Sequence, residues 1–112
     1  MLESWFGDKS KNDTAATRTA QEQAEVDDET RKLALYHYDT CWFCGRVRGA
    51  IERLNLHIEL RNIHADPGHH ETLMREGGSG MVPCLRIEND SGGVEWLYES
   101  ADIIAYLQRR FC

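Results

Sequence analysis

The chain lacks several features that would assign it to a class of proteins. No run of apolar residues approaches the roughly 20 that a membrane-spanning helix needs. Residues 1–11, MLESWFGDKSK, have neither the charged start nor the apolar middle of a secretory signal peptide. The sequence contains no internal repeat. We therefore expect a cytoplasmic protein with no membrane span.

Positive charge is scarce as well. The 112 residues carry 13 Lys and Arg against 19 Asp and Glu, which gives a net charge of −6. No basic patch stands out, so the sequence gives little support for a nucleic-acid partner. A chain of this length forms one compact domain rather than two.

Residues 1–31 differ in composition from the rest of the chain. They hold four Lys and Arg against eight Asp and Glu, and few large apolar residues. Such a segment cannot bury enough surface to offset the entropy lost on ordering. We expect a flexible acidic tail over 1–31 and a folded domain over 32–112. A transient helix around residues 17–31 is compatible with its Ala, Gln and Glu content.

The folded part begins with a strand, a helix and a second strand. LALYHY (33–38) is a nearly continuous apolar run, which is typical of a buried parallel strand. Apolar residues at helical spacing follow up to Leu54 and predict a helix. HIELRNI (57–63) alternates and predicts another strand. These segments form a βαβ unit, whose crossover is right-handed by strong precedent.

The remaining elements are shorter. Residues 68–76 predict a short helix, and GGSG ends it. The strands MVPCLRIE (81–88) and VEWLY (94–98) flank the turn cluster NDSGG and predict a β-hairpin. Ser100 opens a final helix, with Ile104, Leu107 and Phe111 on one face. The order β-α-β-α-β-β-α places the protein in the α/β class.

The stretch CWFC (41–44) carries the chemistry. Thiols in the cytoplasm are kept reduced, so cysteines there indicate catalysis or metal binding before structural disulfides. A helix start lowers the pKa of a thiol from about 8.5 to roughly 3.5–7.5, because free backbone N–H groups and the helix dipole stabilise the thiolate. Cys41 is therefore the candidate nucleophile. Cys44, one turn later, can attack a mixed disulfide formed at Cys41.

Other readings of the cysteines have less support. A structural zinc site needs four ligands, and no second CxxC exists, so we expect no metal. Cys84 can be a third thiol of the site, but a small buried residue at the start of a strand is favoured.

Pro83 has two equal interpretations. It can form a cis peptide that turns the backbone of Val82 toward a ligand, or it can be a simple turn proline.

Together these features resemble a known family. CxxC after the first strand, Val82-Pro83 before the third and a polar helix start after the fourth are similar to a glutaredoxin. VPCLRI…YESADIIAYL also resembles the N-terminal domain of glutathione S-transferases. The resemblance covers residues 32–112 and implies a thioredoxin-like fold, a mixed four-stranded sheet with flanking helices.

The resemblance implies a function and a role for each cysteine. The protein would be a glutathione-dependent thiol–disulfide oxidoreductase, with glutathione as co-substrate, acting as a monomer on glutathionylated or disulfide-containing substrates. Cys41 would take up glutathione as a mixed disulfide, and Cys44 would serve protein disulfides. The alternative is an iron–sulfur cluster carrier, in which the first cysteine and bound glutathione hold the cluster. A transferase-like fragment has less support, because the helical second domain is missing.

The resemblance also implies the glutathione-binding residues. Val82 would pair its backbone with glutathione beside the cis-proline Pro83, and Glu99-Ser100 would hold the γ-glutamyl end. Phe43 stands where glutaredoxins have a tyrosine and would contact glutathione without the hydroxyl. The usual Lys or Arg just before the CxxC pair is absent. Three residues could instead bind the glycine carboxylate of glutathione: His37, Arg46 and Arg48.

Overall fold

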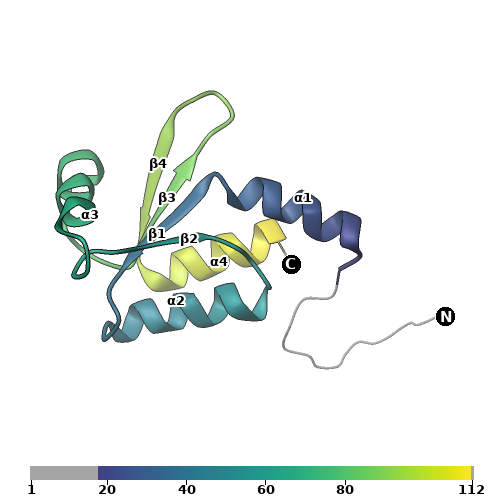
Figure 1. The fold of residues 1–112 in the computed structure, drawn as a ribbon, viewed down its shortest axis with the longest axis horizontal. Helices are drawn as coiled ribbons and strands as arrows, with labels where there is room; N and C mark the ends of the chain where they lie inside the picture. Colours follow the sequence, from purple (N-terminus) through teal and green to yellow (C-terminus); the bar gives the residue numbers. More distant parts are fainter. Residues whose placement is uncertain (1–17, 112) are drawn as a thin grey trace.

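The computed structural model describes residues 18–111 (Figure 1). The elements follow in the order α1 (Ala20–Thr30), β1 (Leu33–His37), α2 (Trp42–Arg53), β2 (Glu59–Asn62), α3 (Pro67–Thr72), the π-helical turn η2 (Leu73–Gly77), β3 (Cys84–Glu88), β4 (Val94–Tyr98) and α4 (Ser100–Phe111). From β1 onward this is the order that the sequence predicts.

The strands form one sheet in the order β2-β1-β3-β4. β1 pairs with β2 in parallel, whereas β1 with β3 and β3 with β4 pair antiparallel. The sheet is therefore mixed, and helices flank it. This arrangement is the thioredoxin-like α/β fold that the resemblance implies.

One face of the sheet is covered by α2 and α4, which lie side by side (Figure 1). β1 is buried along its whole length, as its apolar sequence predicts. Leu33 and Leu35 point to this face and pack against the helices. The main core consists of Leu33, Leu35, Val47, Ile51, Leu54, Leu56, Ile58, Leu85, Ile87, Ile103, Leu107 and Phe111.

The opposite face carries a smaller core beneath α3 and η2. Tyr36, Ile63, Leu73 and Cys84 are buried there, and Val82 and Tyr98 are among the partly buried residues packed on them. Tyr36 lies opposite Cys84 in the antiparallel pair of β1 and β3. The loop after β1 and the segment before β3 therefore meet at one edge of the sheet.

Helix α1 lies within the segment predicted to be a flexible tail. Thr19 caps it in a capping box with Glu22, and Val26 packs against the main core. Arg18, just ahead of the helix, donates to the carbonyls of Leu54 and Phe111. The prediction of a flexible tail is therefore wrong for residues 20–30, because capping and polar contacts hold a helix that has little apolar surface. Residues 1–17 of the predicted tail lie outside the described residues.

No helix among the described residues is both long and apolar enough to cross a membrane.

Candidate redox site

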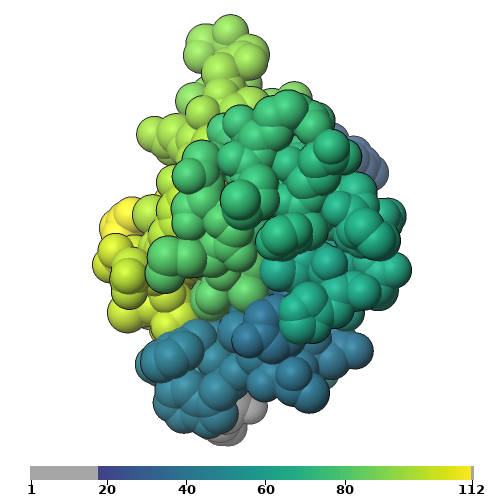
Figure 2. Space-filling view, turned by 90° about the vertical axis from the view of Figure 1, so that its left-hand side faces the viewer, coloured from purple at the N-terminus to yellow at the C-terminus, as the bar shows by residue number. Residues whose placement is uncertain are grey.

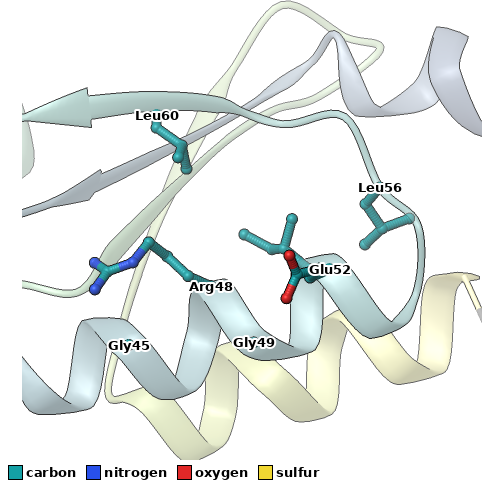
Figure 3. Close-up of a pocket in the computed structure, with 7 residues that line it drawn as sticks. Gly45, Arg48, Gly49, Glu52, Leu56 and Leu60 are labelled. Atoms are coloured by element: carbon teal, nitrogen blue, oxygen red, sulfur yellow. The ribbon is translucent and has the colours of Figure 1, made fainter. Parts of the chain in front are cut away.

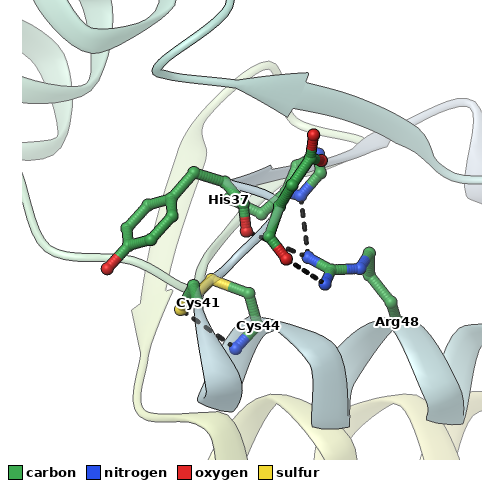
Figure 4. The surroundings of a disulfide bond; sticks show 6 residues. His37, Cys41, Cys44 and Arg48 are labelled. Atoms are coloured by element: carbon green, nitrogen blue, oxygen red, sulfur yellow. Dashed lines mark hydrogen bonds between the residues drawn. A yellow bond between two sulfur atoms is a disulfide. The ribbon is translucent and has the colours of Figure 1, made fainter.

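The two cysteines of CWFC form a disulfide at the start of α2 (Figure 4). Cys41 is the N-cap residue, and its backbone is still extended, so the helix begins just after it. The Cα atoms of Cys41 and Cys44 are 5.1 Å apart. The N–H of Cys44 points at the sulfur of Cys41 at 3.1 Å. Cys44 is fully buried, whereas Cys41 is 8% exposed, so Cys41 is the more accessible sulfur.

The contact between the Cys44 N–H and the Cys41 sulfur has a chemical consequence. The first N–H groups of a helix have no partner within the helix, and the helix dipole is positive at this end. A thiolate formed at Cys41 on reduction would accept this N–H as a charge-assisted hydrogen bond. The geometry can therefore stabilise a nucleophilic thiolate at Cys41.

The loop between β1 and α2 is held by Arg48 of α2. Its guanidinium lies 2.9 Å from Nδ1 of His37 and donates to the carbonyls of Tyr38 and Asp39 at 3.3 and 3.1 Å. Burial lowers the pKa of His37, and the Arg48 charge lowers it further, so the ring is neutral near pH 7 and can accept from Arg48. Of the three residues offered by the sequence for a glycine carboxylate, His37 and Arg48 thus contact each other.

Arg46, the third of those residues, lies apart from this contact. It is exposed, and its guanidinium stacks over the ring of Trp42 at 5.7 Å. It lines a cavity of about 460 Å³ beside the disulfide, together with Asp39, Thr40, Cys41, Trp42, Gly45 and Arg48. Two arginine residues therefore line the cavity beside Cys41.

The peptide between Val82 and Pro83 is cis. Of the two alternatives that the sequence left open for this proline, the structure has the cis form. β3 begins directly after it at Cys84. Because Tyr36 pairs with Cys84, the backbone of Val82 lies beside the loop that leads to Cys41. Figure 2 shows the blue start of α2 and the green segment around residue 80 together on one face of the molecule.

Glu99 and Ser100 join β4 to α4 at the same edge of the sheet. Glu99 is exposed and has a φ of +75°, which is unusual for a residue other than glycine. Its carbonyl accepts the first hydrogen bond of α4, from Ile103 at 3.0 Å, and Ser100 is buried. Tyr98, just before them, donates to the carbonyls of Gly77 and Ser79. This link brings the start of α4 close to the segment that leads to Val82.

Three large apolar side chains near the disulfide are exposed. Trp42 and Phe43, between the cysteines, are 69% and 54% exposed, and their rings meet edge to face at 5.0 Å. Met81, just before the cis peptide, is 64% exposed. The contacting rings of Trp42 and Phe43 thus leave apolar surface exposed beside the disulfide.

A second cavity of about 550 Å³ lies between α2 and β2 (Figure 3). Gly45 and Gly49 form its floor on the helix, and Leu56 and the half-exposed Leu60 lie across from them. Gly45 and Arg48 line both this cavity and the one beside the disulfide. The two cavities therefore follow α2 from Cys41 toward its end.

Cys84 lies close to the site in sequence but does not have the properties of a reactive thiol. It is fully buried, and burial raises the pKa of its thiol to about 11. This agrees with the favoured prediction of a small buried residue at the start of a strand. Within residues 18–111, no three His, Cys, Asp or Glu side chains are grouped as metal ligands.

Sequence reasoning missed the residues that organise this site from outside the motif. Asn62 donates to the carboxylate of Asp39 at 3.2 Å, and His64 stacks on Tyr38 at 4.2 Å. The hydroxyl of Tyr98 forms hydrogen bonds with the segment before the cis peptide. No spacing in the sequence indicates these contacts, because they depend on how the loops pack.

The sequence profile of the family "Glutathione S-transferase, N-terminal domain" matches residues 35–112. No curated protein matches the sequence. Among solved structures, one similar chain is maleylacetoacetate isomerase from Anaeromyxobacter dehalogenans 2CP-1, with dicarboxyethyl glutathione and citrate bound in its active site. It is 28% identical, with a TM-score of 0.55, over 71% of this chain and 37% of that one.

Two further structures show how far the similarity extends. An epsilon-class glutathione S-transferase from the housefly Musca domestica is 26% identical, with a TM-score of 0.54, over 71% of this chain and 35% of that one. A thioredoxin-like protein, 22% identical with a TM-score of 0.54, matches 70% of this chain and 96% of its own length, and shows the fold alone. The present chain thus spans little more than a third of the isomerase and the transferase. The matched profile covers most of the folded region, and the chain belongs to the family of glutathione S-transferase N-terminal domains.

Proposed function

We propose that the chain is a glutathione-dependent thiol–disulfide oxidoreductase that reduces glutathione mixed disulfides, protein disulfides or both. The observation that carries the proposal is the disulfide between Cys41 and Cys44 at the start of α2, with the Cys44 N–H directed at the Cys41 sulfur. Thiol–disulfide exchange needs a first sulfur that can be stabilised as a thiolate and a second thiol within reach of it, and the N–H directed at Cys41 and the position of Cys44 one turn later support both roles.

The reaction follows from ordinary exchange chemistry. The Cys41 thiolate attacks the glutathione sulfur of a mixed disulfide, a new S–S bond forms, and the substrate leaves as its thiolate. A second glutathione thiolate then attacks the glutathione sulfur on Cys41 and releases glutathione disulfide. The sum is one mixed disulfide and one glutathione converted to one substrate thiol and one glutathione disulfide. Cys44 offers a second route, in which it displaces the bound partner and forms the Cys41–Cys44 disulfide.

The same proposal assigns the binding of glutathione. The backbone of Val82, beside Pro83, would pair with the cysteine of glutathione, and Phe43 would cover it. Glu99 would accept from its ammonium group, and Ser100 would offer a hydroxyl to the γ-glutamyl carboxylate. Support comes from the shared edge of the sheet where these residues lie, and from the isomerase, which has glutathione bound in its active site.

The test is the steady-state reduction of a small glutathione mixed disulfide, with glutathione supplied and glutathione disulfide measured through glutathione reductase. We expect turnover by the wild type and a loss of at least about 100-fold in Cys41→Ser. Cys44→Ser should retain turnover of the small substrate and lose most of its activity on a protein disulfide. Cys84→Ser serves as the matched control, since it removes a buried thiol that takes no part.

Two results would overturn the proposal. One is activity in Cys41→Ser equal to that of the wild type. The other is a folded, fully reduced wild type without turnover on either kind of disulfide. In the second case, visible absorption after anaerobic reconstitution with iron, sulfide and glutathione would instead support the cluster carrier.

A further inference from the structure

The side chain of Arg48 reaches back from α2 to the loop that precedes Cys41 (Figure 4). One of its nitrogens lies 2.9 Å from Nδ1 of His37 and donates to the Tyr38 carbonyl, and the other donates to the Asp39 carbonyl. A single guanidinium therefore contacts three consecutive residues. Such a fork of fixed donors is specific to arginine, since the ammonium of a lysine is a point charge on a flexible stem.

The Tyr38 carbonyl connects Arg48 to the reactive cysteine. It accepts from Arg48 at 3.3 Å and also from the backbone N–H of Cys41 at 3.2 Å. A displacement of this carbonyl would move the backbone of Cys41. The sulfur would then lose its alignment with the Cys44 N–H, which is the contact available to stabilise a thiolate.

The opposite side of the loop is held by different partners. The Asp39 carboxylate accepts from Asn62 at 3.2 Å, and the Tyr38 ring stacks on His64. The side chains of Tyr38 and Asp39 are thus fixed from the end of β2, whereas their carbonyls are fixed from α2. Asp39 brings a negative charge to within two residues of Cys41, and the Arg48 cation lies against the same residue. Arg48 therefore both orders the loop and offsets this charge.

We propose that Arg48 is a positioning residue for Cys41, which holds the loop so that the thiolate stays in front of the Cys44 N–H. The inference rests on the proposed exchange chemistry at Cys41, and it concerns the contacts of Arg48 with the loop.

Arg46 offers a matched control. It carries the same charge on the same helix and lines the same cavity beside Cys41. Its guanidinium lies over the Trp42 ring, where it stacks as a cation on an aromatic face. Loss of charge near Cys41 is therefore common to Arg46→Met and Arg48→Met, whereas loss of the contacts to the loop is specific to Arg48→Met.

The experiment measures the rate at which iodoacetamide alkylates Cys41 in the reduced full-length protein at pH 7, with the modified peptide quantified by mass spectrometry. This rate depends on the thiolate at Cys41 and needs no glutathione. We expect Arg48→Met to react about 10-fold more slowly than the wild type, and Arg46→Met to stay within about 2-fold. Arg48→Lys keeps the charge without the fork and should remain about 3-fold slower than the wild type.

Several outcomes would overturn the inference. The first is an alkylation rate of Arg48→Met within 2-fold of the wild-type rate. The second is an equal loss of rate in Arg46→Met, and the third is a wild-type rate in Arg48→Lys. Either of the last two would mean that the effect of Arg48 is one of charge alone. If Arg48→Met does not fold, as judged by circular dichroism, the comparison of Arg48→Lys with the wild type still decides. Failure here is distinct from failure of the proposed function, because a wild type without turnover can still show the Arg48 effect on alkylation.

Discussion

Removal of the Arg18 side chain tests how α1 is attached to the domain. The guanidinium of Arg18 donates to the carbonyl of Leu54 at 2.7 Å and to that of Phe111 at 2.6 Å. Leu54 is the C-cap of α2, and Phe111 is the last residue of α4. The last carbonyls of a helix lack partners within it, and a cation is favoured there by the helix dipole. Arg18 thus provides hydrogen-bond donors to backbone carbonyls at the C-terminal ends of both core helices.

The cost of Arg18→Ala can be estimated from these two bonds. A hydrogen bond with a charged partner contributes about 1.5–3 kcal/mol, and partial exposure of Arg18 places its bonds near the lower end. The carbonyls can rebind water after the substitution, which recovers part of the loss. We expect the free energy of unfolding to fall by about 2 kcal/mol, and the midpoint of thermal unfolding to fall by about 10 °C for a domain of this size.

The assay is urea unfolding followed by circular dichroism, together with amide hydrogen exchange over α1. Arg31→Ala is the control, because Arg31 pairs with Asp28 on the surface, where the two side chains are 74% and 69% exposed. We expect the control to unfold at the wild-type urea concentration. The reasoning is refuted if Arg18→Ala also unfolds there and its α1 amides keep their wild-type protection.

Three other predictions concern the core, the third thiol and pH. Leu35→Ala, in the fully buried centre of β1, should lower the free energy of unfolding by about 3 kcal/mol, whereas Leu60→Ala, at a half-exposed position of the edge strand β2, should lower it far less. The midpoints of urea unfolding of the two variants measure this difference. In the native, reduced protein at pH 8, Cys84 should resist alkylation and react only after unfolding, because burial raises its pKa to about 11; rapid native labelling would contradict this. The lowered pKa of His37 means that the unfolded chain binds a proton more readily, so stability should fall as pH drops below about 6.5; His37→Asn should remove this part of the pH dependence.

The strands and helices from β1 onward could be predicted from the sequence, because apolar runs, hydrophobic periods and turn residues mark them. β1 is the clearest case, since its five residues are all buried. The exact face of α4 could not be predicted. Ile103 is fully buried and Ile104 only partly, although the expected face included Ile104. Two adjacent isoleucines leave the helix phase open by about one residue, and packing against α2 decides it.

The sequence indicated a transient helix around residues 17–31, but the attachment of α1 to the domain was missed because it is polar. Its contacts with the rest of the domain include Gln23 to the carbonyl of Asn55, Asp27 to His57 and Glu29 to Arg110. The composition of a segment indicates how much apolar surface it can bury, but it does not indicate polar contacts of this kind. One local signal was present, however. Thr19 followed three residues later by Glu22 is the spacing of a capping box, which the structure forms.

The cysteine pair of the candidate site could be located from spacing, whereas the contacts that hold its loop could not. CxxC after a buried strand places Cys41 at a helix start wherever this fold forms. The contacts of Arg48 depend instead on the path of the loop between β1 and α2, which no period in the sequence describes. Sequence reasoning therefore left His37, Arg46 and Arg48 as equal candidates for one role, and the structure separates them by their partners.

Conformations and exposures that are unfavourable for the residue concerned occur together at one edge of the sheet. Within residues 18–111, two residues other than glycine have positive φ, Asn55 and Glu99. Asn55 follows the end of α2, where asparagine commonly adopts this conformation. No such rule accounts for Glu99, and a conformation of this kind persists where the surrounding structure or a ligand requires it. Because β4 runs antiparallel to β3, Glu99 lies at the edge where β3 begins and β1 ends. The exposed side chains of Trp42 and Met81 lie at this edge as well. An unfavourable backbone conformation and exposed apolar side chains therefore occur together beside the disulfide, as expected for a functional site, where local rules of folding are commonly violated.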